Sequence, residues 1–336
     1  MRALVCADLH IASKHLDRGI ELLRQLKDLA NLNNLDAIFV LGDFLDEKDK
    51  HSLSLSLAVH KMLKSIKAEK MPLYWIRGNH ELPYANRPNH SIIHMFSEVC
   101  HVVSTPQIVS GKDYSLYLLP WFPADKFITA AKTLSRSTYE STGKNRFLLA
   151  HVGLDQTKVN TSDLRISSGV GLKDLCLDNY HLCLLGDIHL HQQVAKNCYY
   201  LGAPISHHFG DEHQNRVWVL DTDLRAIEPL PLLTEFPKYA TYQVDDPSHP
   251  IVGFNPQDFN RIECHANLRA ALSIRYGKEV VFKTTGNTIP EVARRVLAGA
   301  TEEDILKEYL TPRNWMSTHY DLAVKYLNQA KDRMSI

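Results

Sequence analysis

The segment Ala37-Ile38-Phe39-Val40-Leu41-Gly42-Asp43-Phe44-Leu45-Asp46 joins a wholly apolar run to a glycine and two aspartates. Five consecutive apolar residues are typical of a strand buried on both faces, as in the centre of a parallel sheet. Gly42 permits a sharp turn directly after that strand. Apolar strands at 2–7 and 72–76 and helix-period stretches at 16–31 and 53–66 surround the segment. This β-α-β-α-β order predicts a layered α/β domain with parallel strands near its centre.

The chain downstream of residue 100 predicts shorter strands and then a separate unit. Strands are expected at 114–119, 147–150, 181–185, 198–201 and 216–220, with a helix at 126–139. Residues 228–231, Glu-Pro-Leu-Pro, predict an exit segment, so the first domain is placed at 1–234. A small α+β unit is expected at 235–300, with strands at 238–244 and 278–284, and C-terminal helices at 301–336. The helical patterns themselves cover 289–297, 302–310 and 318–334.

Composition excludes several classes of protein. The 336 residues include 38 basic and 38 acidic side chains, a net charge of zero, and 44% are hydrophobic, which argues against intrinsic disorder. No apolar run approaches the roughly 20 residues of a membrane span, and the N-terminal run is too short for a signal peptide. Six cysteines without C-x-x-C spacing argue against a structural zinc cluster and indicate a reduced, cytoplasmic setting. Eighteen histidines point instead to metal binding or acid–base chemistry.

Five short polar motifs stand at or just after predicted strand ends. They are Asp8-Leu9-His10, Gly42 to Asp46, Gly78-Asn79-His80-Glu81, His151, and Gly186-Asp187-Ile188-His189. Groups beyond the carboxyl ends of strands in open α/β sheets face one crevice. Each aspartate alone is better explained as a helix cap or turn residue, but the joint order of the motifs argues against that explanation.

Such a set of carboxylates, imidazoles and a carboxamide is sufficient for two divalent ions. Asp43 stands in the middle of the order and is able to bridge them with its two oxygens. Two ions about 3.5–4 Å apart polarise a phosphoryl oxygen and activate water for an in-line displacement. Oxygen and imidazole ligands without thiolate favour Mn²⁺, with Mg²⁺ or Fe²⁺ as alternatives.

In this order the motifs resemble those of the calcineurin-like metallophosphoesterases. Within that superfamily the chain resembles the SbcD-type DNA nucleases, particularly the short phage-encoded recombination nucleases. The subgroup is indicated by the total length, by the helical C-terminus, and by the segments Tyr200-Leu201-Gly202-Ala203-Pro204 and Phe209-Gly210-Asp211-Glu212. The resemblance implies a layered β-sandwich flanked by helices, with a smaller α+β cap and C-terminal helices.

The resemblance also implies a role for each motif residue. One ion would be held by Asp8, His10, Asp43 and His189, and the other by Asp43, Asn79, His151 and Asp187. His80 would orient the phosphate or protonate the leaving oxygen, and Asp46 would fix the orientation of an imidazole. Asp187 departs from the family pattern, which has G-H-x-H at this point. An aspartate still ligates through oxygen, but it adds negative charge and makes the second site harder.

The function implied is a two-metal DNA endo/exonuclease, the nuclease subunit of an SbcCD-like recombination or repair complex, located in the host cytoplasm if viral. Residues 235–300 would cap the site and bind DNA, and 301–336 would dock an SbcC-type coiled-coil ATPase; a homodimer is compatible with this. Loop residues available to contact DNA are Lys14, His15, Tyr84, Asn86 and Arg87, although ordinary exposed loop residues are the plainer interpretation. His207, His208 and His213 are expected in a surface loop near the site at most.

Two other functions stay open at this point. A phosphatase or small-molecule phosphodiesterase would use the same chemistry on another substrate. A catalytically silent scaffold is supported only by Asp187. The net charge of zero counts against tight autonomous DNA binding, which normally needs a surplus of Lys and Arg.

Overall fold

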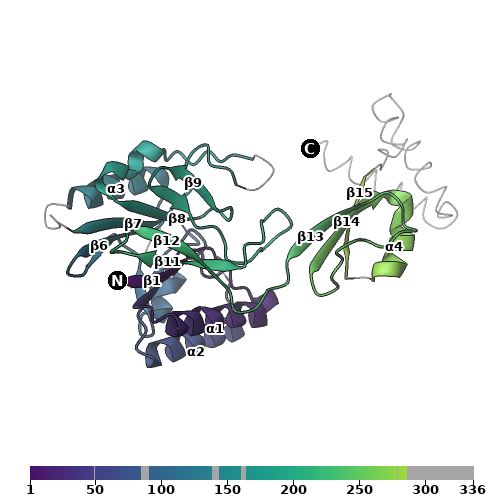
Figure 1. Cartoon of the computed structure of the whole chain (residues 1–336), viewed down its shortest axis with the longest axis horizontal. Coiled ribbons are helices and arrows are strands. Elements are labelled where there is room, and N and C mark those ends of the chain that lie inside the picture. The colour runs from purple at the N-terminus through teal and green to yellow at the C-terminus, as the bar shows by residue number, and fades with distance from the viewer. Residues whose placement is uncertain (49, 85–90, 138–143, 160–163, 278, 286–336) are drawn as a thin grey trace, which may run out of the picture. The chain divides into compact units, whose positions relative to one another are not determined.

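The computed structural model describes residues 1–48, 50–84, 91–137, 144–159, 164–277 and 279–285 (Figure 1). The chain divides into two compact units, the first comprising Met1–Ala240 with Gln257–Phe259, and the second comprising Thr241–Pro256 with Asn260–Ile336. The helices expected at 289–297, 302–310 and 318–334, and with them the whole of 301–336, lie outside the described residues.

The first unit contains two six-stranded sheets. The strands of one sheet, in the order β12-β11-β1-β2-β3-β4, are β1 (Arg2–Cys6), β2 (Ala37–Leu41), β3 (Leu73–Ile76), β4 (His101–Val103), β11 (Arg216–Asp221) and β12 (Ala226–Pro231). Those of the other, in the order β5-β6-β7-β8-β10-β9, are β5 (Gln107–Ser110), β6 (Tyr114–Leu119), β7 (Asn145–His151), β8 (Leu182–Gly186), β9 (Gln192–Ala195) and β10 (Cys198–Tyr200). The strands β1 to β4 are parallel to one another, and so are β6, β7 and β8.

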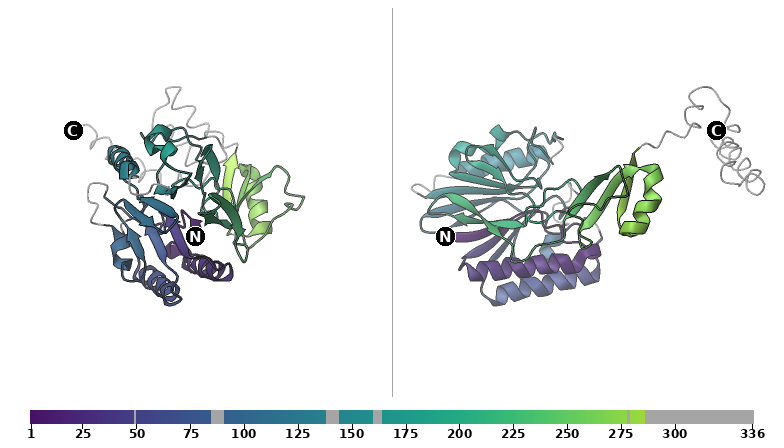
Figure 2. Two further views of the ribbon diagram at one scale, coloured as in Figure 1. Left: turned by 60° about the vertical axis from the view of Figure 1, so that its left-hand side comes forward. Right: turned by 45° about the vertical axis from the view of Figure 1, so that its right-hand side comes forward.

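Three α-helices cover the outer faces of these sheets. α1 (Leu16–Leu32) and α2 (Leu53–Ala68) lie side by side against the first sheet, and α3 (Ala124–Arg136) lies against the second (Figure 2). Short 3-10 helices occupy Ser13–His15 (η1), Ile92–Phe96, Leu172–Leu175, Leu177–Asn179 and Ala266–Leu268. The order of layers is therefore helix, sheet, sheet, helix.

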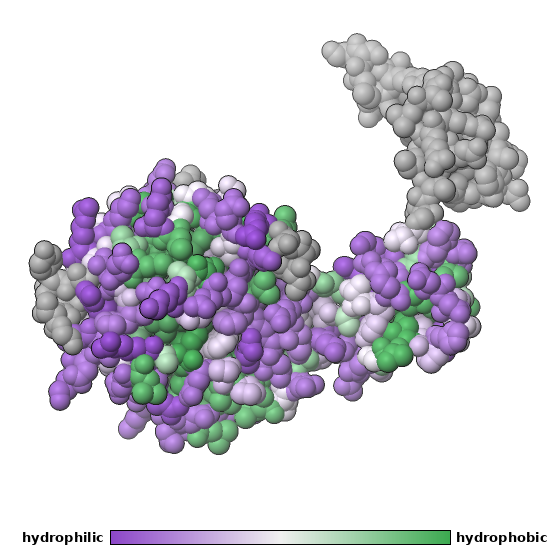
Figure 3. All heavy atoms as spheres, turned by 45° about the horizontal axis from the view of Figure 1, so that its top comes forward, coloured by the Kyte–Doolittle hydropathy of each residue, from purple (hydrophilic) through white to green (hydrophobic). Residues whose placement is uncertain are grey.

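The strand β1 shows why the central strands carry so few polar residues. Leu4 and Cys6 belong to the core formed with α1 and α2, whereas Ala3 and Val5 pack between the two sheets. Successive side chains of a strand point to opposite faces, so a strand with two covered faces must be apolar throughout. The predicted layered α/β fold is confirmed. In the first unit, hydrophilic side chains cover much of the face seen in Figure 3, with apolar patches between them.

The segment 228–231, which the sequence predicts as an exit segment, belongs instead to a strand. β12 pairs antiparallel with β11, and Pro229 stands opposite Trp218 and Pro231 opposite Arg216. β12 is the edge of its sheet, where a proline that lacks an N–H on the outer side costs no ladder hydrogen bond. The prolines therefore mark an edge strand, and the first unit continues to Ala240.

The second unit has a small sheet of its own. Its strands, in the order β13-β14-β15, are β13 (Tyr239–Val244), β14 (Phe259–His265) and β15 (Val281–Thr285), of which β13 and β14 begin in residues assigned to the first unit. Leu272 of α4 (Arg269–Tyr276) packs with Val244 and Ile262 in a local core. The strands expected at 238–244 and 278–284 correspond to β13 and β15, while β14 and α4 had no counterpart in the prediction. Among the described residues, no helix is long and apolar enough to cross a membrane.

Candidate metal centre

Parallel strands from both sheets end around one cavity of about 410 Å³. β1, β2 and β3 of the first sheet lead into the motifs at Asp8, Asp43 and Asn79, and β7 and β8 of the second end at His151 and before Asp187. The carboxyl ends of parallel strands meet at one edge, which is why motifs distant in sequence converge here. The structure thus brings together all the predicted ligand side chains, which are Asp8, His10, Asp43, Asn79, His151, Asp187 and His189.

The backbone of these loops is held in an unusual conformation. Asp8, His10, Asp43 and Asp187 have φ values of 56°, 41°, 48° and 93°, in the left-handed region that non-glycine residues rarely adopt. A Cβ at Gly78 would overlap the carboxylate of Asp43. Strain of this kind concentrates where side chains must be aimed at a functional site.

Glu81 holds the loop after β2 in place, a role that the sequence did not reveal. Its buried carboxylate accepts hydrogen bonds from the backbone N–H groups of Asp43, Phe44, Leu45 and Gly78 at 3.1, 2.7, 3.1 and 2.7 Å. Burial and the charge of Asp43 raise the pKa of Glu81 to about 7, while the N–H groups of Leu45 and Gly78 lower it. The available signal was an acidic residue directly after the Asn79-His80 pair.

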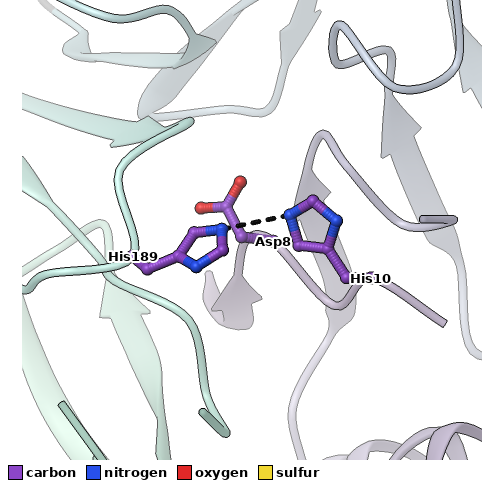
Figure 4. Close-up of side chains that lie close together, drawn as sticks. All are labelled: Asp8, His10 and His189. Atoms are coloured by element: carbon purple, nitrogen blue, oxygen red, sulfur yellow. Dashed lines mark hydrogen bonds between the residues drawn. The ribbon is translucent and has the colours of Figure 1, made fainter. Parts of the chain in front are cut away.

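One group of converging atoms involves Asp8, His10, Asp43 and His189. The Nε2 atoms of His10 and His189 lie 3.1 Å apart, and the nearer Asp43 oxygen, Oδ2, is 3.7 Å from His10 Nε2. Asp8 offers an oxygen within 4.8 Å of both imidazoles, as Figure 4 shows from the convergence of the three side chains. We call these four residues the first ligand group.

A second group is formed by Asp43, Asn79, His151 and Asp187. His151 Nε2 lies 2.9 Å from Asn79 Oδ1, 3.4 Å from Asp187 Oδ1 and 3.5 Å from Asp43 Oδ1. The Asn79 oxygen faces only acceptor atoms, an arrangement that a cation satisfies and that otherwise favours rotation of the amide. Asp43 directs Oδ2 toward the first group and Oδ1 toward the second ligand group.

All three imidazoles are oriented through Nδ1. His10 Nδ1–H donates to Asp46 at 3.2 Å, His189 Nδ1–H donates to Asp211 at 3.1 Å, and His151 Nδ1–H donates to the Leu41 carbonyl at 2.6 Å. A proton on Nδ1 leaves the lone pair of Nε2 free, as metal-binding histidines require. Asp46 therefore lies where the sequence placed it, beside an imidazole N–H.

The charges of the site fit cations. Burial raises the pKa of Asp8 to about 7, although the His151 and His189 imidazoles lower it. Burial lowers the pKa of His189, but the hydrogen bond to Asp211 and the charges of Asp8 and Asp43 outweigh it and raise that pKa to about 9. The clustered acidic groups thus retain protons that a divalent ion displaces on binding.

His80 lies on the wall of the same cavity. Its Nδ1–H donates to the Asp46 carbonyl at 2.6 Å, and its Nε2 is 3.9 Å from Asp43 Oδ2. Its backbone N–H donates to Asp43 Oδ1 at 2.9 Å, which helps to fix the shared carboxylate. The ring is therefore close to both groups and still partly exposed to the cavity.

The predicted DNA contacts are only partly brought to this cavity. Lys14 and His15, both in η1, line it. Tyr84 is half exposed and is not one of the lining residues. Asn86 and Arg87 lie outside the part of the chain that the structure describes.

The expectation that His207 and His208 belong to a surface loop is wrong for both as far as the cavity is concerned, since both line it. His207 Nε2–H donates to the Asp8 carbonyl at 2.9 Å, and the backbone N–H groups of both histidines donate to Asp211 Oδ2 at 2.7 and 3.1 Å. Asp211 thus folds this loop back over the site while it orients His189. Sequence reasoning missed Asp211, since only its place in the quoted Phe209 to Glu212 segment hinted at it.

Comparisons with known proteins agree with this geometry. The family profile described as "Calcineurin-like phosphoesterase" matches residues 1–227. A curated relative, "Putative phosphoesterase 244L" of Invertebrate iridescent virus 6, is 22% identical over 293 residues, which cover 83% of this chain and 99% of the relative.

Solved structures with a similar arrangement include TT1561 of Thermus thermophilus, with 14% identity, a TM-score of 0.42, and coverage of 68% of this chain and 98% of that one. A dimetal phosphatase from Danio rerio has 10% identity, a TM-score of 0.42, and coverage of 65% and 95%. On the match that spans residues 1–227, this chain belongs to the calcineurin-like phosphoesterases, a family of metal-dependent hydrolases that bind two divalent ions.

Proposed function

We propose that the chain is a two-metal phosphodiesterase that hydrolyses the backbone of DNA, as the nuclease subunit of an SbcCD-like complex. The observation that carries the hydrolytic part is the position of Asp43, whose two oxygens face two different ligand groups. A carboxylate shared in this way suits a pair of adjacent ions.

In this proposal Asp8, His10, Asp43 and His189 hold one ion, and Asp43, Asn79, His151 and Asp187 hold the other. Mn²⁺ is the ion we expect, with Mg²⁺ and Fe²⁺ as alternatives, because the donors are oxygens and imidazoles. The bound ions supply Lewis acidity and a nucleophile at neutral pH.

His80 is the residue of this chain that we assign to proton transfer. Its Nδ1–H is engaged by the Asp46 carbonyl, so Nε2 is the atom available to donate to the phosphate or to the departing sugar oxygen. Asp46 holds His10 through its carboxylate and His80 through its carbonyl, and so positions both rings.

The charge of the site favours a phosphodiester. Two divalent ions carry four positive charges, and Asp8, Asp43 and Asp187 carry three negative ones, which leaves one net positive charge. A phosphodiester has a single negative charge and balances it, whereas a phosphomonoester has up to two. Asp187, which departs from the family pattern, thus shifts the preference toward diesters.

The alternative substrate class is a phosphomonoester or a small diester, and the zero net charge of the chain favours it. A protein without surplus positive charge binds a DNA backbone weakly by itself. For this reason we include a partner in the proposal, an SbcC-type ATPase that docks on residues 301–336. Their deletion should abolish association with the ATPase and spare hydrolysis of a small diester.

The test combines two substrates and one matched variant. Purified protein is assayed on linear duplex DNA and on bis-p-nitrophenyl phosphate, with Mn²⁺, Mg²⁺ or a chelator, and with or without a candidate ATPase. We expect Mn²⁺-dependent cleavage of both, loss of both in Asp43→Asn, and no loss in Asp125→Asn, an exposed aspartate on α3. Hydrolysis of the small diester without any cleavage of DNA would support the alternative.

A further inference from the structure

One wall of the metal cavity carries cationic groups that the proposed chemistry does not use. Lys14 and His15 of η1 and Arg18 in the first turn of α1 line it. Within the described ranges, none of these three side chains forms an ion pair with a carboxylate. Cations that stand unpaired beside a two-metal site are available to an anion of the substrate.

Arg18 is the most enclosed of the three. Its Nη2 donates to the carbonyls of Ser206 and Pro237 at 2.8 and 3.1 Å, and its buried Nε has no hydrogen-bond partner among the described residues. Carbonyl oxygens orient a guanidinium but do not neutralise it. Because a partly buried charge is costly without a counter-charge, this position suits a bound phosphate.

Aromatic rings stand directly beside these cations. Tyr239 and Phe259 are stacked, with centroids 4.4 Å apart and an interplanar angle of 19°, and the His15 ring is 5.1 Å from Phe259. The Arg18 guanidinium carbon lies 5.6 Å from the Phe259 ring centre. The Phe259 N–H donates to the Lys238 carbonyl at 2.9 Å, and both residues belong to the first unit.

These rings lie along two adjoining hollows. Tyr239 lines the metal cavity, and Phe259 lines a second hollow of about 540 Å³ that shares Lys14, His15 and Arg18 with it. The second hollow also contains carboxylates, those of Asp17, Glu21 and Glu235, so it is not cationic as a whole. A phosphate therefore fits at the shared wall, and what the second hollow adds is an aromatic surface.

We propose that this wall is a nucleotide subsite: Arg18 and Lys14 bind the phosphate next to the scissile one, and the Tyr239–Phe259 pair stacks the attached base. This rests on the proposed function, which places the scissile phosphate at the metal centre. Bases in a duplex stack on one another and are not free to stack on protein rings, so the subsite selects single-stranded or frayed DNA. Phosphate contacts combined with aromatic stacking are the usual means of binding single strands.

The test compares two substrates with Mn²⁺, the single-stranded oligonucleotide dT8 and bis-p-nitrophenyl phosphate, which has no base to stack. In Phe259→Leu and Tyr239→Leu, the ratio of kcat/KM for dT8 to that for the small diester should fall about 5- to 150-fold, the range expected for loss of one stacked base. Tyr74→Leu is the control, because Tyr74 is a partly buried ring stacked on Phe39 elsewhere in the unit, and it should leave the ratio unchanged.

Arg18→Gln tests the phosphate contact by a different readout. The slope of log(kcat/KM) for dT8 against log[salt] should become shallower by about 0.7, the value for one single-strand phosphate contact. The aromatic variants should keep the slope, and so should Arg24→Gln, an exposed arginine of the same helix. If Arg18→Gln does not fold, because it loses its two carbonyl contacts, Arg18→Lys should preserve the slope and the aromatic variants decide.

Folded Phe259→Leu and Tyr239→Leu proteins with an unchanged substrate ratio would overturn the subsite and leave the proposed nuclease function standing. Wild-type protein that hydrolyses bis-p-nitrophenyl phosphate but neither dT8 nor duplex DNA would overturn the DNA assignment, and the subsite with it. The two failures are therefore distinguishable.

Discussion

The two ligand groups share Asp43 but differ in the atoms they offer. The first group has two imidazoles, those of His10 and His189, whereas the second has one imidazole and a carboxamide. Oxygen donors are harder than imidazole nitrogens, so the second group should favour Mn²⁺ or Mg²⁺ more strongly than the first. Two sites built on the same carboxylate therefore need not bind their ions equally.

The groups also differ in how they are supported. His10 and His189 are held by side-chain carboxylates, of Asp46 and Asp211, whereas His151 is fully buried and held by the backbone carbonyl of Leu41. A side-chain support is removable by substitution and a backbone support is not. The first ligand group is thus the one whose geometry mutation can loosen without changing a ligand.

The largest expected effect comes from removing what the groups share. Asp43→Asn replaces the bridging carboxylate with a group that has one oxygen and no charge, so both sites lose affinity. We expect Mn²⁺-dependent hydrolysis of bis-p-nitrophenyl phosphate to fall by about 10⁴-fold or more. Titration followed by the electron paramagnetic resonance of free Mn²⁺ should show fewer than two bound ions. Two tightly bound ions in this variant would contradict the sharing of Asp43.

His80 belongs to neither group, and its substitution should separate chemistry from ion binding. His80→Ala removes the proposed proton donor, so kcat should fall by about 10²- to 10³-fold while two Mn²⁺ ions remain bound. The measurements are steady-state kinetics on the small diester and the same resonance titration. Loss of an ion would show that His80 is a ligand and that the first group is larger than we infer.

Sequence patterns were sufficient for the residues that follow strands. Asp8, Asp43 and Asp187 stand next to apolar runs, and the chain direction of parallel strands takes them to one edge whatever the details of packing. Glu81 and Asp211 could not be assigned in this way, because their partners are backbone N–H groups and an imidazole from other segments. His207 was misplaced for the same reason, since its contact with the Asp8 carbonyl depends on how a loop returns 199 residues later.

Asp211 offers a test of the difference in support. Asp211→Ala leaves every ligand in place but frees the Nδ1 of His189, so Mn²⁺ affinity at one site should fall about 10- to 100-fold while the other is retained. Glu212→Ala, at the exposed neighbouring position, is the control and should bind both ions normally. Equal weakening of both sites would mean that the two groups do not respond independently.

The smallest effect concerns pH and follows from the protons held by the metal-free first group. The pKa of His189 is raised to about 9 and that of Asp8 to about 7, so between pH 7.5 and 8.5 His189 still carries a proton that an ion must displace, while Asp8 is mostly ionised. Because the folded-state pKa of His189 lies above this window, raising the pH removes the competitor and strengthens binding. We expect the Kd for Mn²⁺ at this site to fall about tenfold per pH unit across the window, the slope for one displaced proton. Asp211→Ala should flatten the slope, since Asp211 is the first of the groups that raise this pKa, whereas Glu212→Ala should preserve it. A Kd independent of pH in the wild-type protein would show that the His189 imidazole is already neutral, and that the carboxylates around it do not charge the site as the geometry indicates.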